Sequence, residues 1–207
     1  MFRNILRPDS PLMITMTQIT DCIFLSVFWL LGCLPVITAG VSTAALYDAV
    51  YHTFRKGEKN SWSRFLHAYR QNLKPGLIPS AVVLILGAGL TRAAIWLWNQ
   101  AVYGNLSWGV FAGAAFFLLV LVGIGSITFP LLSRFETGTI QLLGNTVRLG
   151  LANLPLTLGL ALVNAAVIFL CVCYIVPLFF LPALGALLST LFIEPMLKPY
   201  MPKEEED

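Results

Sequence analysis

The sequence has few charged residues. Only 11% of its 207 residues are Asp, Glu, Lys or Arg, whereas 57% are hydrophobic. A soluble domain carries about a quarter of its residues as charged side chains, so this chain has too few of them to cover a water-facing surface. The mean hydropathy of +0.80 and the long apolar runs instead predict helices that cross a bilayer. We therefore expect residues 1–207 to form one transmembrane domain, without a separate soluble domain.

Residues that usually carry catalysis or bind metals are also scarce. There are two histidines, His52 and His67, and there is no Gly-x-x-x-x-Gly-Lys-Ser/Thr sequence for binding phosphates. Cys171-x-Cys173 has no nearby histidine or third thiol that would complete a metal site. We therefore expect no enzyme, no metal and no cofactor. Nucleic acid is not expected either, because membrane topology already accounts for the basic loops.

Apolar runs of roughly 20 residues, the length needed to cross the hydrocarbon core, divide the chain into spans. The run 14–34 is too long for the hydrophobic part of a typical signal peptide, so we expect it to be retained. Four later runs also have the required length: 76–98, 107–131, 149–173 and 175–196. The predicted fold is an all-α transmembrane helix bundle. It has six spans if residues 37–54 return through the bilayer, and five if they do not.

The distribution of Lys and Arg favours six spans. With six spans, all but one of the 13 basic residues lie in segments on one side of the membrane, and none lies in the connections on the other side. Lys and Arg accumulate on the cytoplasmic side, so both termini are predicted to be cytoplasmic. With five spans, Arg3 and Arg7 would lie outside. The one basic residue outside these segments is Arg92, which lies within a predicted span.

The second predicted span is short and rich in small residues. After Pro35 come Gly40, Ser42, Thr43 and Ala44, which allow helix backbones to approach closely inside a membrane bundle. We expect this hairpin to be buried by its neighbours. These residues are the predicted surface for helix packing or for a partner.

An amphipathic helix is predicted over residues 62–73, in the loop after the second span. Ser61 can cap it, Pro75 is expected to end it, and its apolar face repeats with helical spacing. That face comprises Trp62, Phe65, Leu66, Tyr69 and Leu73. Such a profile predicts an interfacial helix with its aromatic face at the acyl boundary. A weaker counterpart follows the fourth span, over about 135–147.

Ionisable and polar residues within spans are functional candidates, because burying them in lipid is costly. Asp21 and Asp48 either bind a proton or a cation together, or they meet interfacial water or pair with loop cations. His52, one turn beyond Asp48, can add a titrating group. Arg92 either reaches the outer interface or is a buried cation. Asn164 is expected to form an interhelical hydrogen bond.

Near the end of the last span, Glu194 is expected to pair with Lys198 at the membrane boundary.

Two stretches of the sequence resemble the YesL family. The first runs from Trp29 through Leu34-Pro35-Val36-Ile37-Thr38-Ala39-Gly40-Val41-Ser42-Thr43-Ala44-Ala45-Leu46-Tyr47, and the second is Phe129-Pro130-Leu131-Leu132-Ser133-Arg134-Phe135-Glu136. The resemblance implies a multi-pass protein of the bacterial plasma membrane. Genes of this family often lie near carbohydrate ABC importers, and the family has no established catalytic residues to carry over.

Three functions are compatible with these observations. The expected one is a non-enzymatic accessory or scaffold subunit that contacts the permease of a carbohydrate ABC importer and the surrounding lipid. The alternative is a small stand-alone transporter or channel, which would be favoured if Asp48 and Asn164 lined one cavity. A membrane enzyme ranks third.

Overall fold

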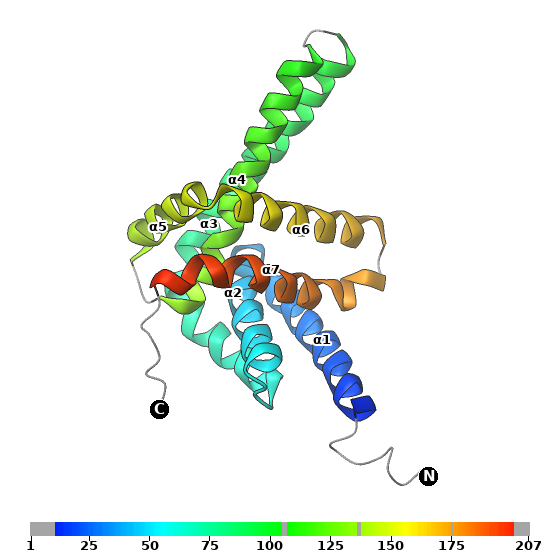
Figure 1. Ribbon diagram of the computed structural model, residues 1–207, viewed down its shortest axis with the longest axis vertical. Coiled ribbons are helices and arrows are strands. Elements are labelled where there is room, and N and C mark those ends of the chain that lie inside the picture. Colours follow the sequence, from blue (N-terminus) through cyan, green and yellow to red (C-terminus); the bar gives the residue numbers. More distant parts are fainter. Residues whose placement is uncertain (1–10, 105–106, 136–137, 175, 201–207) are drawn as a thin grey trace.

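The computed structural model describes residues 11–104, 107–135, 138–174 and 176–200 (Figure 1). Arg3, Arg7, Glu136, Ile175, Lys203 and the acidic end of the chain lie outside these ranges. Within the described ranges the chain forms helices and no strands, which confirms the predicted all-α fold. The α-helices are α1 (Pro11–Cys33), α2 (Ala39–Val50), α3 (Ser61–Val102), α4 (Trp108–Arg134), α5 (Thr139–Ala152), α6 (Leu154–Cys173) and α7 (Leu181–Leu197).

Five of these helices are long and apolar enough to cross a membrane, namely α1, α3, α4, α6 and α7. The segment predicted as the second span is different. Its α-helix, α2, has 12 residues, and with the π-helical turn that continues it the helical stretch has 17 residues and extends about 26 Å, still short of the roughly 30 Å of hydrocarbon. A 3-10 turn (Val36–Thr38) precedes α2 and a π-helical turn (Tyr51–Arg55) follows it. Among the described residues, the helices of spanning length are therefore five, and α2 is a short central helix.

The predicted burial of this segment is confirmed. Almost every residue of α2 is buried, and the helix contacts α1, α3, α4 and α7. Its small residues permit this, because a Cβ added at Gly40 would overlap the side chains of Ser80 on α3 and Phe129 on α4. Two hydrogen bonds join α2 to α1. Trp29 Nε1 donates to Thr43 Oγ1 at 3.2 Å, and Ser42 Oγ donates to the Trp29 carbonyl at 2.9 Å.

The prediction that Pro75 ends a helix is wrong, because α3 continues through Pro75 and Pro79 as a 42-residue helix. Each proline removes one backbone hydrogen bond, but packing in a membrane bundle can hold such a helix together. Here Gly76 lies against Val41 of α2 and Leu132 of α4. The predicted interfacial helix is thus the first part of a longer element.

The aromatic face of this first part of α3 packs against protein. Phe65 is buried in a core cluster with residues of α1 and α2, and its ring centroid lies 6.0 Å from that of Phe28. Tyr69 stacks on Phe65 at 6.1 Å, whereas Trp62 remains exposed. The expectation that the whole face lies at the acyl boundary is therefore wrong, because α1 and α2 already cover most of it.

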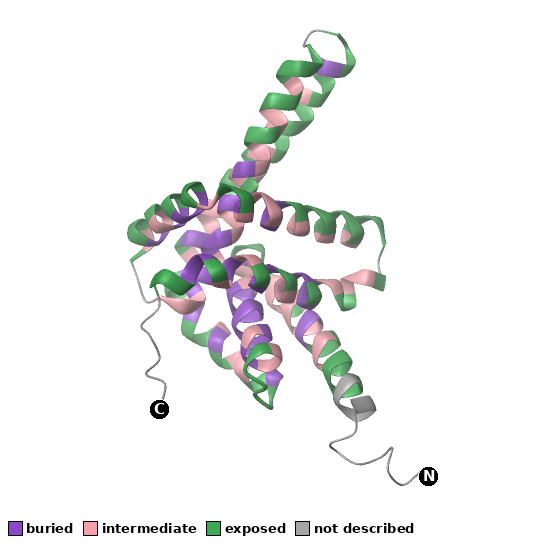
Figure 2. Cartoon of the chain, in the orientation of Figure 1, coloured by how far each residue is buried: buried purple, intermediate pink, exposed green. Residues whose placement is uncertain are grey.

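The later helices form two hairpins that point in different directions. The outer parts of α3 and α4 project together beyond the rest of the molecule, and α6 and α7 project sideways (Figure 1). The short helix α5 follows α4 and ends where the chain turns at Asn153 into α6. Buried residues concentrate where α2 meets its neighbours, and the projecting parts are largely exposed (Figure 2). Their apolar side chains are suited to contact with lipid or with other membrane helices.

Gly40→Ala should destabilise the protein by about 1–3 kcal/mol, because the added methyl group overpacks the contact of α2 with Ser80 and Phe129. Thermal unfolding of the purified protein in detergent measures this effect. The control is Gly144→Ala on α5, where an added Cβ meets no atom within 4 Å, so that variant should be as stable as the wild type or slightly more stable. Equal melting temperatures for the two variants would contradict the close packing of α2.

Candidate functional site

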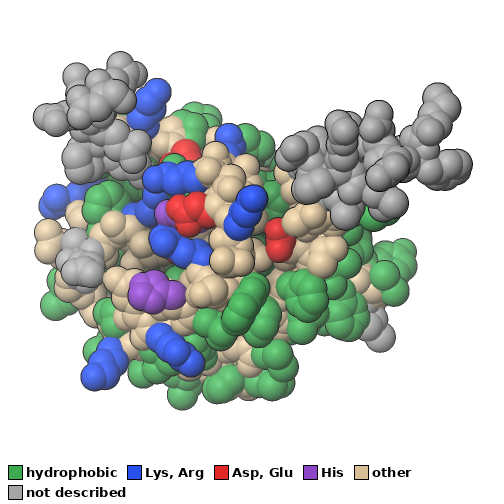
Figure 3. Space-filling view, turned by 90° about the horizontal axis from the view of Figure 1, so that it is seen from below, with side chains coloured by type: hydrophobic (Ala, Val, Ile, Leu, Met, Phe, Trp, Pro, Cys, Tyr) green, Lys and Arg blue, Asp and Glu red, His purple; other side chains and the backbone are tan. Residues whose placement is uncertain are grey.

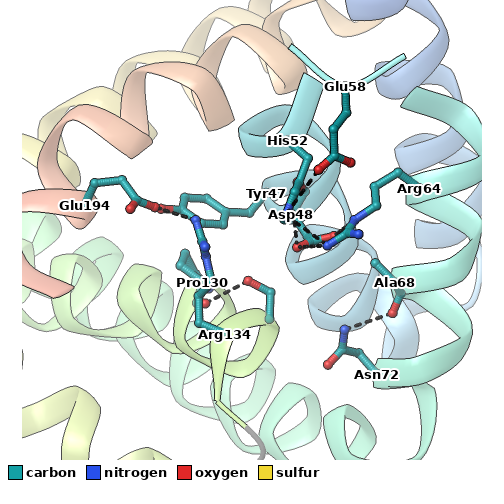
Figure 4. A network of polar contacts seen from close by, with 11 residues as sticks. Tyr47, Asp48, His52, Glu58, Arg64, Ala68, Asn72, Pro130, Arg134 and Glu194 are labelled. Atoms are coloured by element: carbon teal, nitrogen blue, oxygen red, sulfur yellow. Dashed lines mark hydrogen bonds and ion pairs between the residues drawn. The ribbon is translucent and has the colours of Figure 1, made fainter. Parts of the chain in front are cut away.

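Charged side chains from four helices gather around the last turns of α2 (Figure 4). They form two groups. The Asp48 cluster comprises Asp48, His52, Glu58 and Arg64. The Glu194 cluster comprises Tyr47, Tyr51, Arg134 and Glu194. Because the π-helical turn Tyr51–Arg55 continues directly from α2, the residues that contribute to both clusters follow one another on a single buried element.

In the Asp48 cluster, the carboxylate of Asp48 is held by a two-point contact with Arg64. Arg64 Nε lies 2.6 Å from Oδ2, and Nη2 lies 3.3 Å from Oδ1. Asp48 is only 5% exposed, and a buried carboxylate without a cation is strongly unfavourable. Asp48 therefore pairs with a cation, Arg64 in the first turn of α3, which is one of the roles expected for it.

His52 joins the same cluster through both ring nitrogens. Its Nε2 lies 3.1 Å from Arg64 Nη2, and its Nδ1 lies 2.9 Å from the Asp48 carbonyl oxygen. A guanidinium can only donate hydrogen bonds, so Nε2 must be the acceptor. The ring proton therefore lies on Nδ1, where it is donated to Asp48. Glu58 lies in the loop between α2 and α3, and its Oε1 is 4.0 Å from His52 Nε2.

Asp21 lies beside this cluster but has a different partner. Ser61 Oγ donates to Asp21 Oδ1 at 2.7 Å, which joins α1 to the start of α3. Ser61 therefore does not cap α3 as predicted; the cap position is Asn60, in the left-handed region at φ 73°. Asp21 and Asp48 each contact the first turn of α3, through different residues. Among the residues that the structure describes, no group of three or more His, Cys, Asp or Glu could hold a metal ion.

In the Glu194 cluster, one carboxylate oxygen accepts two hydrogen bonds. Tyr47 Oη and Arg134 Nη2 each lie 2.8 Å from Glu194 Oε1. The Arg134 guanidinium also lies over the ring of Tyr51, 3.7 Å from its centroid, in a cation–π contact. These contacts join α2 and its π-helical turn to α4 and α7. Glu194 is thus paired with Arg134 rather than with Lys198 as the sequence suggested.

The two stretches that resemble the YesL family meet at this place. Phe129, in the second stretch, packs beside Gly40 of the first. Tyr47, which ends the first stretch, shares the Glu194 carboxylate with Arg134 of the second. This cluster was not predicted from the sequence. Its residues belong to three separate helices, and the available signal was that each stretch has, at or near its end, a residue able to donate a hydrogen bond to a carboxylate: Tyr47 in the first and Arg134 in the second.

The end of α2 therefore acts as a clamp between helices. Arg64 connects it to α3, Arg134 and Glu194 connect it to α4 and α7, and Arg55 Nε donates to Thr190 Oγ1 of α7 at 3.2 Å. Figure 3 shows that Lys and Arg side chains gather on this end of the molecule, around acidic side chains. Arg64 balances the charge of Asp48, and Arg134 balances that of Glu194, which is the arrangement of a structural junction.

The remaining candidates lie elsewhere. Arg92 is exposed on the projecting part of α3. Asn164 lines a cavity of about 920 Å³ between the two hairpins, and its side chain donates to the Leu160 carbonyl of its own helix at 3.0 Å. The expected interhelical bond of Asn164 is therefore wrong. Asp48 is not among the residues that line this cavity, so the structure does not bring Asp48 and Asn164 together.

Arg64→Ala should destabilise the protein, because it leaves the Asp48 carboxylate buried without a cation. We expect a loss of about 2 kcal/mol, less than the roughly 3–5 kcal/mol of a fully buried pair, since 36% of the Arg64 side chain is exposed. Adding Asp48→Asn should restore part of this loss. Thermal unfolding of the single variants and the double variant forms a double-mutant cycle. Additive effects would contradict a direct pairing.

Nitrogen NMR of the protein labelled at histidine tests the geometry of His52. We expect the Nδ1–H tautomer, because Arg64 donates to Nε2. His67 is exposed and provides an internal control whose ring is free to exchange between tautomers. In Arg64→Ala the signals of His52 should move toward those of His67. An Nε2–H tautomer at His52 in the wild type would refute the contact.

Comparison with known proteins gives one match. No curated protein and no solved structure matches the chain. A family model described as "Protein of unknown function, DUF624" matches residues 22–91, about a third of the chain. The matched segment runs from the middle of α1 to the middle of α3 and contains the whole Asp48 cluster, whereas Arg134 and Glu194 lie beyond it. Over the hairpin of α1 and α2 and the first part of α3, the chain is thus similar to a family without an assigned function.

Proposed function

We propose that the protein is a non-enzymatic accessory subunit of a carbohydrate ABC importer in a bacterial plasma membrane. The observation that carries this proposal is the projecting hairpin of α3 and α4. Its outer part has little contact with the rest of the chain, and it exposes large apolar side chains that could pack on another membrane protein (Figure 2). These include Trp96, Trp98, Trp108, Phe116 and Phe117.

The clamp at the end of α2 supports the same function. A subunit that positions a partner needs a rigid base for its binding surface, and α3 is anchored at its first turn by Asp48 and Asp21. In α4, Arg134 is anchored by Glu194. Both helices of the projecting hairpin are therefore fixed at the end opposite to its tip.

The partner and the cellular location rest on the resemblance to the YesL family, and membership of that family is part of the proposal. We infer that both termini are cytoplasmic, which requires the buried α2 segment to return the chain to the side where α1 begins. The Lys and Arg side chains that gather at one end of the molecule support this inference (Figure 3). This end contains Arg55, Lys56, Lys59 and Arg64, which the rule for positive loops assigns to the inside.

A stand-alone transporter for a small solute is the second candidate, favoured by the cavity that Asn164 lines. It has less support than the accessory function, because Asp48 is paired with Arg64 and does not line the cavity. Uptake of a solute by vesicles that contain only this protein, abolished by Asn164→Leu, would favour transport.

Purification of the tagged protein from its native membrane in mild detergent, followed by mass spectrometry, tests the accessory function. We expect importer permease subunits in stoichiometric amounts. Phe117→Ala should reduce their recovery roughly tenfold, as expected for loss of an aromatic anchor. Phe169→Ala on α6 is the matched control, because the two side chains are similarly exposed at 62% and 66%. Recovery of the protein alone would reject the accessory function.

A further inference from the structure

The cavity between the two hairpins has walls formed mainly by helices of spanning length. Its lining includes residues 82–90 of α3, 121–130 of α4, 164–172 of α6 and 182–193 of α7, with Trp29 and Tyr47 from the first hairpin. The volume of about 920 Å³ lies in the range of roughly 300–1,000 Å³ that is usual for ligand sites. None of the residues in the Asp48 cluster takes part, so the cavity is distinct from that cluster.

The polar residues of this lining offer little to a polar ligand. Their side chains donate hydrogen bonds back to carbonyl groups of the helix to which each belongs, as seen at Thr43, Ser126, Thr146, Asn164 and Ser189. A sugar or an ion that entered would lose its hydration without gaining equivalent partners, which costs several kcal/mol for each unsatisfied group. The cavity is therefore suited to hydrocarbon.

Three glycines help to make the space. Gly87, Gly89 and Gly125 all line the cavity, and a Cβ added at any of them would meet no atom within 4 Å. This differs from Gly123, which lies between two lining residues of α4 but faces α6, where a Cβ would overlap Thr157. A glycine inside a helix costs about 0.5–1 kcal/mol relative to alanine. At these three positions no neighbouring atom of the chain would prevent a larger side chain. The glycines therefore enlarge the cavity.

We propose that this cavity binds the hydrocarbon chain of a membrane lipid. Its walls lie in the helices of spanning length, so bilayer lipid is the apolar molecule that surrounds it. The cavity is open to its surroundings, as the exposed lining residues Ile85 and Val172 show, so within a bilayer lipid rather than water reaches it. A partner's transmembrane helix is a rigid cylinder about 10 Å wide and would need a groove of matching shape. A single lipid chain is narrower and flexible. This proposal does not depend on the accessory function.

Native mass spectrometry of the full-length protein, incubated with vesicles of phosphatidylethanolamine and phosphatidylglycerol before extraction, tests this site. The wild type should retain one lipid. Gly125→Leu fills the cavity and should lower the bound fraction roughly tenfold, because the side chain takes the place of packing contacts with the lipid chain. The control is Gly113→Leu, on the projecting part of the same helix, where an added Cβ is equally unobstructed outside the cavity. Equal retention by both variants would overturn the proposal.

A second measurement does not depend on whether Gly125→Leu folds. Phosphatidylethanolamine with a photoreactive diazirine in its acyl chain is added to the wild-type protein, and labelled peptides are mapped. We expect labelling to concentrate on residues 82–90, 121–130 and 164–172. Even labelling along all exposed spans would overturn the proposal. So would capture of another protein by a photoreactive amino acid placed at Leu86, because the occupant would then be a partner helix.

Discussion

The arrangement of the helices depends on two carboxylates at one end of α2, of which Asp48 is buried and Glu194 is partly buried. Each is stabilised by a guanidinium from another helix: Asp48 by Arg64, and Glu194 by Arg134. A buried carboxylate leaves its helix few alternative positions, because any shift that separates it from its cation exposes an unpaired charge to a medium of low polarity. The apolar contacts among these helices are less directional. The ion pairs therefore select one arrangement among the many that apolar packing would allow.

This constraint explains why a helix too short to cross the membrane lies at the centre of the bundle. Lipid cannot satisfy the polar groups of such a segment, so other helices must surround it. Gly40 and Ser42 allow them to approach closely, and the ionic end of α2 then determines which helices these are. The surrounding helices present their apolar sides outward, and the space left between the two hairpins is apolar as well.

The helical class, the approximate bounds of most helices and the burial of α2 could be predicted, because hydropathy and residue size report them locally. The partner of Glu194 could not be predicted. Arg134 lies 60 residues away and Tyr47 lies 147 residues away, and only the packing of α2, α4 and α7 brings them together. Pro75 was misleading for a similar reason. Its local effect is to interrupt a helix, and the contacts of Gly76 with two neighbouring helices outweigh that effect.

The length of α3 has a mechanical consequence. At 1.5 Å per residue, its 42 residues extend about 60 Å, from the ion pair of Arg64 to the tip of the projecting hairpin. A tilt of about 5° at the clamp would thus displace the far end by about 5 Å, roughly the rise of one helical turn. One end of this helix is held by the charged residues, and the other end lies at the tip of the projecting hairpin. A small tilt of the packed first part of α3, up to Ser80, would thus be amplified at the tip of the projecting hairpin.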